Sequence, residues 1–307
     1  MDLIIFTIAM AGLIYGADFV IKESERIALH FNISSFVIGA TLVAVGTSLP
    51  EMAVSMSASA KGSADIAVAN VIGSTIFNIS LVLGLVFLLA KKINPHRDLF
   101  AKDSAWSLFP ILIFILMGID GKLSMFDGIL FLLLMGAYLM FLINSNSLEE
   151  DIDEDLKKEK FNWLKTGVLL LIGFIFVIVG ANFAIDSAGN IARSFGISEW
   201  IIGLFLVAFG TSLPELTISI KSAINNNADL AIGNIIGSNV ANFTMVLGLS
   251  AIINPLNIDF SSNYFDIAAA FIATLMLVFI TANKLYNKSA GIALLIVLGL
   301  VIQNSLV

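Results

Sequence analysis

The sequence predicts an all-α integral membrane protein, with ten transmembrane helices arranged as two five-helix repeats of inverted topology. Three observations predict this fold. Of the 307 residues, 58% are apolar and only 13% are charged, which is too little charge to cover a soluble protein of this length. The apolar residues form runs of about 18 to 25 residues, the length that crosses ~30 Å of hydrocarbon as a helix. The second half of the chain also repeats the first.

Ten apolar runs are the predicted spans. Because they are continuously apolar rather than alternating, they indicate helices and exclude a transmembrane β-barrel. The first run has no basic residue before it, which is not typical of a signal peptide, so we interpret it as a retained span. The predicted spans are residues 2–21, 36–59, 66–90, 104–118, 124–144, 163–184, 199–220, 228–253, 264–282 and 289–305.

Lysine and arginine fall mostly on one side of these spans. Three of the 16, Lys61, Lys122 and Arg193, lie on the side of the N-terminus, and the other thirteen lie on the opposite side. Basic loops favour the cytoplasm. We therefore predict a multi-pass protein of the cell membrane, with both termini outside and the central loop in the cytoplasm. The thirteen are Lys22, Arg26, Lys91, Lys92, Arg97, Lys102, Lys157, Lys158, Lys160, Lys165, Lys221, Lys284 and Lys288.

The repeat appears when the sequence is shifted by 164 residues. Residues 16–84 then align with 180–248 without a gap, and about 30 of the 69 pairs are identical. Shared Gly, Pro, Ser, Asn and Glu at one fixed offset indicate a duplication rather than a chance resemblance of apolar segments. The clearest matches are Gly46-Thr47-Ser48-Leu49-Pro50-Glu51 with Gly210-Thr211-Ser212-Leu213-Pro214-Glu215, and Asn70, Gly73, Ser74 and Asn78 with Asn234, Gly237, Ser238 and Asn242.

This duplication divides the chain into three parts. Residues 1–144 form the first repeat, with its motif at 39–84, and residues 163–307 form the second, with its motif at 203–248. An acidic linker, 145–162, joins them. Five spans per half is an odd number, so the second copy enters the membrane upside down. Inverted repeats of this kind place a binding site near the midplane and favour a transporter.

Each copy of the Gly-Thr-Ser-Leu-Pro-Glu motif is expected to break its helix. Proline removes one backbone hydrogen bond and its ring collides with the carbonyl four residues earlier. Such broken backbone is tolerated at membrane depth only where protein surrounds it. The motif also places Glu51 and Glu215 there. A carboxylate at the bilayer centre costs at least ~2.5–3.5 kcal/mol, so a matched pair indicates a functional site rather than a structural hydrogen bond.

The polar groups of the two motifs form an all-oxygen set. Carboxylates, hydroxyls and carbonyls suit Ca²⁺ and Na⁺ better than Zn²⁺ or copper. Two facing carboxylates repel each other, and one Ca²⁺ or several Na⁺ would balance them. Ser74 and Asn78, like Ser238 and Asn242, are four residues apart and share a helix face; the alternative interpretation is that these four side chains join packed helices.

These paired motifs, each followed by Gly-Ser-x-x-x-Asn, resemble the α-repeats of the cation/calcium exchanger superfamily, and most closely its prokaryotic sodium/calcium branch. The resemblance covers nearly the whole chain. It implies antiport of one Ca²⁺ against about three Na⁺ by alternating access. It also implies a core of eight helices, across which the first and sixth helices slide as a pair.

The resemblance also implies which residues bind the ions. Glu51 and Glu215 would share Ca²⁺, with the backbone carbonyls of Thr47 and Thr211 completing its position. Asn78 and Asn242 would line the centre. In several relatives, including potassium-dependent exchangers, the position of Asn242 carries aspartate. The absence of that aspartate here disfavours K⁺ cotransport and proton coupling. The outlying sodium positions would use oxygens of Ala44, Ser48 and Ser238 on one side, and of Ala208, Ser212 and Ser74 on the other.

Features of the same sequence also bear on the other possible functions. An H⁺/Ca²⁺ exchanger, or an exchanger of another divalent cation, is the alternative transporter, and a cation channel would also use midplane carboxylates. The chain has no cysteine, no His-Glu-x-x-His and no Gly-x-Ser-x-Gly, so we predict no enzyme activity and no cofactor. The acidic run at 149–155 argues against a nucleic-acid partner and lacks the glycine of a calcium-binding loop. No obligate protein partner is evident; Ca²⁺, Na⁺ and the lipid bilayer are the predicted partners.

Overall fold

The computed structural model describes residues 1–90, 103–144, 161–195 and 208–305, and four residues of the segment between the first two ranges, Ile93, Pro95, Asp98 and Leu99. Most of the predicted linker and its acidic run lie outside the described residues, as do residues 199–207 of the seventh predicted span.

Helices make up almost all of the described chain, which confirms the all-α prediction. The first half contains α1 (Asp2–Phe31), α2 (Ser35–Ile38), the π-helix η1 (Gly39–Val43), α3 (Ala44–Thr47), α4 (Leu49–Ala60), α5 (Ala64–Ile76), the π-helix η2 (Phe77–Leu83), α6 (Gly84–Leu89), α8 (Ser104–Met117), the 3₁₀-helix η3 (Gly118–Asp120) and α9 (Met125–Asn144). The second half contains α11 (Trp163–Ser194), α13 (Ala208–Thr211), α14 (Leu213–Ile224), α15 (Ala228–Ala241), the π-helix η5 (Asn242–Leu247), α16 (Gly248–Ile253), α17 (Phe260–Ala282) and α18 (Lys288–Ser305). Strands β1 (Lys122–Leu123) and β2 (Leu256–Asn257) pair antiparallel and tie two loops together.

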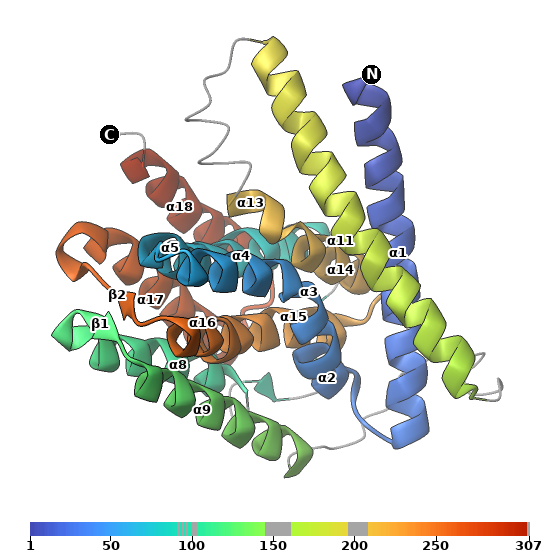
Figure 1. Ribbon diagram of the computed structural model, residues 1–307. Helices are drawn as coiled ribbons and strands as arrows, with labels where there is room; N and C mark the ends of the chain where they lie inside the picture. The colour runs from blue at the N-terminus through green and yellow to red at the C-terminus, as the bar shows by residue number, and fades with distance from the viewer. Residues whose placement is uncertain are drawn as a thin grey trace.

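Helices α1 and α11 lie side by side along one edge of the molecule, inclined to the other helices (Figure 1). Glycines allow this close approach, as is common between membrane helices. A Cβ atom at Gly16 would come within 2.8 Å of the Gly173 carbonyl oxygen, and one at Gly180 within 3.0 Å of the Ala9 carbonyl oxygen.

Helix α15 lies inside the rest of the molecule, and its residues are buried along its whole length by α2, η1, α3, α8 and α14 among others. Helices α2 and η1 lie directly on α15. Gly237 allows this contact, since a Cβ atom there would lie 2.4 Å from the Ala40 carbonyl oxygen. The glutamate-bearing helices α4 and α14 pack against α5 and α15, respectively. The two motifs therefore meet inside the molecule rather than on its surface.

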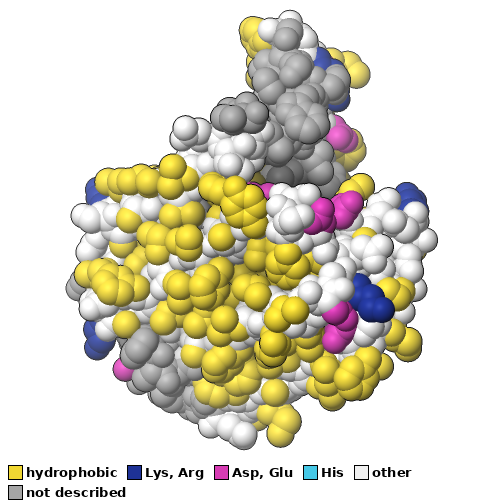
Figure 2. Space-filling view, turned by 90° about the vertical axis from the view of Figure 1, so that its left-hand side faces the viewer, with side chains coloured by type: hydrophobic (Ala, Val, Ile, Leu, Met, Phe, Trp, Pro, Cys, Tyr) yellow, Lys and Arg dark blue, Asp and Glu magenta, His cyan; other side chains and the backbone are white. Residues whose placement is uncertain are grey.

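The outer surface is strongly apolar. Figure 2 shows one face covered mostly by hydrophobic side chains with few charged ones, as expected of a surface that contacts lipid. Seven described helices are long and apolar enough to cross a bilayer, or eight if the bent pair Ser35–Thr47 and Leu49–Ala60 is one span. The helix Ser104–Asp120 is apolar but shorter. The count of ten spans stays a prediction.

Two helices are longer than the spans predicted for them. Helix α1 ends at Phe31 rather than near residue 21, and α11 continues to Ser194 rather than ending near residue 184. The prediction followed the apolar run and ended where charges begin. These segments remain helical because neighbouring parts of the protein bind the polar side chains of the extension, for example Asn227, whose Nδ2 donates to Glu25 Oε1 at 2.6 Å.

A candidate cation site between the two broken helices

The predicted helix breaks are present in both copies of the motif. Helix α3 ends at Thr47 and α4 begins at Leu49 at an angle of 46°, and α13 ends at Thr211 just before α14 begins at Leu213. Ser48 and Ser212 stand at the breaks with nearly identical backbone angles, φ −82° and ψ 6° against φ −88° and ψ 4°. Each proline lies in the first turn of the new helix, the position where its missing N–H costs least.

Glu51 and Glu215 follow these breaks and are fully buried. Their hydrogen bonds are reciprocal between the halves. Ser48 Oγ donates to Glu215 Oε1 at 3.2 Å, and Ser212 Oγ donates to Glu51 Oε1 at 3.5 Å. Each carboxylate therefore accepts a hydrogen bond from the serine at the break of the other half, which brings the two motifs together.

The second repeated element contributes one serine from each half. Ser74 Oγ donates to Glu51 Oε1 and Ser238 Oγ donates to Glu215 Oε1, both at 3.4 Å. These contacts stay within a half, whereas those of the break serines cross between halves. The same hydroxyl of Ser238 lies 3.4 Å from the Ala44 carbonyl oxygen, so three predicted site residues meet there.

The threonines of the motif are less alike than the serines. Thr47 Oγ1 donates to the Ala44 carbonyl oxygen at 3.1 Å and to Asn234 Oδ1 at 3.2 Å, and lies 3.4 Å from Ser238 Oγ. Thr211 Oγ1 is buried and has no hydrogen-bond partner in the described part of the chain. Ala208 is the first residue of α13, one turn before Ser212, so its carbonyl belongs to the same broken segment.

Asn78 and Asn242 are fully buried, and wide helical turns begin at or just before them. The π-helix η2 begins at Phe77 and η5 begins at Asn242. Single π-turns inside α-helices occur often at functional sites, because they change the direction of the side chains that follow. The repeat therefore places an irregular turn at the same point of both halves.

Three further asparagines support the site, although the sequence analysis assigned none of them to it and named two only as repeated positions. Asn70 Nδ2 donates to the Glu51 backbone carbonyl at 3.2 Å and to Ser55 Oγ at 2.9 Å. Asn234 Nδ2 donates to Ser219 Oγ at 3.0 Å. Both asparagines and both serines match at the 164-residue offset, so the repeat itself contained the signal. Asn239, which accepts from Asn78, has no such match.

The site leaves several buried polar atoms without a partner among the described residues. A buried polar group without a hydrogen bond is destabilising unless something else binds it. Most of these atoms are oxygens, which come from both halves and include two carboxylate oxygens, so a bound cation would satisfy the oxygens among them. They are Glu51 Oε2, Glu215 Oε2, Asn78 Oδ1, Asn242 Oδ1 and Nδ2, Asn239 Nδ2 and Thr211 Oγ1. No group of three or more His, Cys, Asp or Glu side chains arranged to hold a metal ion occurs within the described ranges.

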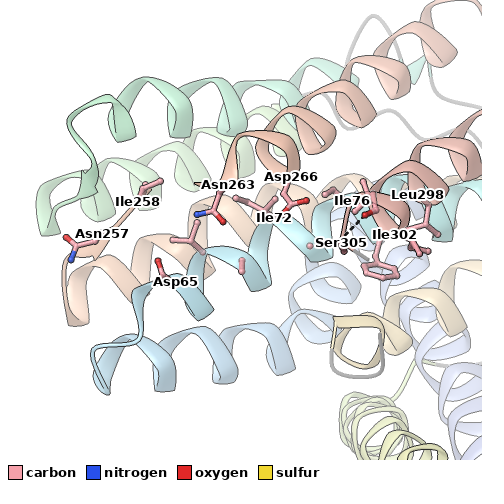
Figure 3. A pocket seen from close by; sticks show the side chains of 15 residues that line it. Asp65, Ile72, Ile76, Asn257, Ile258, Asn263, Asp266, Leu298, Ile302 and Ser305 are labelled. Carbon is pink, nitrogen blue, oxygen red and sulfur yellow. Dashed lines mark hydrogen bonds between the residues drawn. The ribbon is translucent and has the colours of Figure 1, made fainter. Parts of the chain in front are cut away.

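A separate cavity of about 220 Å³ lies along α5, between α17 and α18 (Figure 3). Its walls are mainly apolar, and Asp65, Asn263 and Asp266 are among its polar residues. Gly73 and Phe77 line it, next in sequence to Ser74 and Asn78, but neither glutamate of the candidate site does. The cavity is therefore adjacent to the candidate site and distinct from it.

The chain matches the family described as "Sodium/calcium exchanger protein" over residues 1–144 and 165–307. It is 30% identical to the sodium/calcium exchanger MaX1 of Methanosarcina acetivorans over 94% of this chain and 95% of that protein. It is 42% identical to an uncharacterized membrane protein of Methanocaldococcus jannaschii, over 80% of each chain. Among solved structures, a structure of the sodium-calcium exchanger NCX_Mj superposes with a TM-score of 0.83 at 36% identity, over 98% of this chain and 97% of that one.

Proposed function

Because the chain belongs to the sodium/calcium exchanger family, and is therefore a multi-pass membrane protein of a cation/Ca²⁺ antiporter family, we propose that it exchanges Ca²⁺ for Na⁺ by alternating access. The names of the similar proteins MaX1 and NCX_Mj support Na⁺ as the coupling ion. No part of this proposal requires a cofactor or an enzymatic step.

The observation that carries the proposal is the reciprocal contact between the two buried carboxylates and the opposite break serines. Each glutamate keeps a second oxygen without a partner among the residues that the structure describes. Two carboxylates balance the charge of one Ca²⁺, and the surrounding neutral oxygens supply the higher coordination number that Ca²⁺ prefers. Several Na⁺ at neighbouring positions would use the same oxygens, so the two cations compete.

We assign the ion ligands on this basis. Glu51 and Glu215 would hold Ca²⁺ together with the carbonyl oxygens of Thr47 and Thr211. The hydrogen bonds of Ser48, Ser212, Ser74 and Ser238 to the carboxylates support their use as sodium ligands. The full proposed set is Ala44, Thr47, Ser48, Glu51, Ser74, Asn78, Ala208, Thr211, Ser212, Glu215, Ser238 and Asn242.

The same proposal includes the topology. Residues 1–144 and 163–307 would each form five spans of opposite orientation, joined by the linker 145–162 in the cytoplasm, with both termini outside. A cysteine-free chain makes this directly testable. Single cysteines at Lys61 and Lys284 should react with a membrane-impermeant thiol reagent from opposite sides of the membrane; reaction from the same side would contradict the proposed topology.

Purified protein in liposomes tests the transport reaction. Vesicles loaded with Na⁺ and diluted into Na⁺-free medium should take up radioactive Ca²⁺, and replacing the internal Na⁺ with choline should abolish that uptake. A pH gradient without Na⁺ should drive none. Uptake driven by the pH gradient alone would instead support the H⁺/Ca²⁺ exchanger, and ion flow that needs no counter-ion would support a channel.

A further inference from the structure

The two halves of the candidate site differ in the polar residue that follows the repeated serine. Ser74 is followed by Thr75, whereas Ser238 is followed by Asn239, and the two positions match at the 164-residue offset. Thr75 Oγ1 donates to the Val71 carbonyl oxygen of its own helix at 2.9 Å. Asn239 instead reaches the other half, where its Oδ1 accepts from Asn78 Nδ2 at 3.2 Å.

This contact fixes the orientation of one amide. An asparagine amide presents an oxygen on one side and an NH₂ group on the other. With its Nδ2 donating to Asn239, the Oδ1 of Asn78 is left as a buried oxygen with no partner in the parts of the chain that the structure describes. A cation requires the oxygen, and the NH₂ group in its place would repel it.

A purely structural role would not explain an asparagine at position 239, because its side chain destabilises the fold there. Asn239 is buried, and its own Nδ2 has no partner among the described residues. An unpaired buried donor is destabilising. Threonine at the matching position avoids this cost by bonding its own helix. Asn242, the counterpart of Asn78, has both amide atoms without a partner among the residues described, so no comparable contact orients it.

We propose that Asn239 is a positioning residue of the cation site: by accepting a hydrogen bond from Asn78, it turns the Asn78 side-chain oxygen toward the transported cation. This inference rests on the proposed cation exchange and extends it. Asn239 acts through Asn78 rather than on the ion, and it makes the asparagine of the first half a fixed ligand. Within the described residues, no hydrogen bond orients the side chain of Asn242 in the second half.

The test is Asn239→Thr, which installs the residue found at the matching position and leaves Asn78 without its acceptor. We expect the apparent KM for Ca²⁺ to rise about five- to tenfold, with the maximal rate unchanged within about twofold, because binding rather than movement is affected. The matched control is Thr75→Val, which removes a hydroxyl that bonds only its own helix and should leave the KM unchanged. Melting curves establish that both variants fold, and Asn239→Ala replaces Asn239→Thr if the latter does not.

A double-mutant cycle separates positioning from general packing. In an Asn78→Ala background, Asn239→Thr should cause no further rise in the KM for Ca²⁺. An unchanged KM in folded Asn239→Thr, or effects that simply add in the double variant, would overturn the inference while leaving exchange itself established. If the wild-type protein shows no Na⁺-driven Ca²⁺ uptake, the proposed function fails and this inference fails with it.

Discussion

Helices α4 and α14 carry the same Leu-Pro-Glu sequence. One side of α14 is nevertheless buried against other helices, whereas the matching side of α4 is exposed. Leu213 is 8% exposed, whereas its counterpart Leu49 is 44% exposed. Ile218 is fully buried in a cluster with apolar residues of α1, while its counterpart Val54 lines an open hollow of about 420 Å³ between α4 and α5. The difference comes from α1, which packs on α14, whereas no extensive contact joins its counterpart α11 to α4 in the described structure.

Polar contacts hold α1 over α14. Lys221 Nζ lies 2.6 Å from Asp18 Oδ2 and donates to the Ile14 carbonyl oxygen at 2.9 Å. At the 164-residue offset, Lys221 matches Ser57 in α4, and Asp18 matches Asn182 in α11. The ion pair therefore has no counterpart at the other end of the molecule. If the two halves are inverted as proposed, covering one broken helix and exposing the other is what access from a single side of the membrane requires.

The largest effect is expected from replacing the buried glutamate that each half contains. Glu51→Gln and Glu215→Gln should each reduce Na⁺-driven Ca²⁺ uptake at least about 100-fold, because each leaves a divalent cation with one buried counter-charge. The two losses should agree within a few-fold if the halves contribute equally to the site. Asp259→Asn is the matched control, since it also removes one carboxylate but outside the membrane-spanning helices. Near-normal uptake by either glutamine variant would refute the ligand assignment.

A smaller effect is expected where the halves differ. Cysteine introduced as Val54→Cys should react quickly with a thiol reagent, and Ile218→Cys slowly, because α1 covers the second position. Adding Lys221→Ser should speed the reaction at position 218 about two- to fivefold, the effect of losing a partly exposed ion pair. The background has no cysteine, so each label reports a single site. If the rate at 218 does not change while the protein stays folded, the ion pair does not hold α1 in place.

The smallest effect lies at the start of α17. Asp259 Oδ1 accepts from the backbone N–H groups of Ser261 and Ser262 at 2.9 and 3.1 Å. The hydroxyls of the same two serines also donate to the Asp259 carboxylate, and they, followed by the backbone bonds, lower its pKa from 3.8 to about 2.

Because this pKa is lower in the folded protein, the cap stabilises the fold above about pH 4 and the stabilisation is lost as the pH falls toward 2. Asp259→Ala should therefore lower the melting temperature slightly at pH 7, by an amount that shrinks as the pH falls. A difference that stays constant from pH 7 to pH 3 would exclude the carboxylate cap as its cause.

Sequence alone predicted most of what the two halves share. The Gly-Thr-Ser-Leu-Pro-Glu repeats predicted the helix breaks, because the effect of proline on a helix is local. Burial of Glu51 and Glu215 followed from the cost of exposing a carboxylate to lipid. The serine hydroxyls were expected in the site, but nothing in the spacing indicated that Ser48 and Ser212 cross to the opposite glutamates, since this depends on how the halves pack.

What distinguishes the halves was not predictable in this way. The role of Asn239 could not be predicted from the repeat, because only identical pairs were informative and Asn239 aligns with Thr75. The covering of α14 by α1 also required the structure, because Asp18 and Lys221 are far apart in sequence and each is an ordinary surface charge by itself. The ten-span count and the ligand set rest on family resemblance and pattern, and stay predictions.

The most direct test of the central claim is a crystal structure of the protein soaked with Ca²⁺, or with Sr²⁺ to give an anomalous signal. One divalent ion should lie between Glu51 and Glu215, within about 2.3–2.6 Å of carboxylate oxygens from both halves for Ca²⁺, and excess Na⁺ should displace it. The account is contradicted if the ion binds elsewhere, or if the two carboxylates lie too far apart to share it.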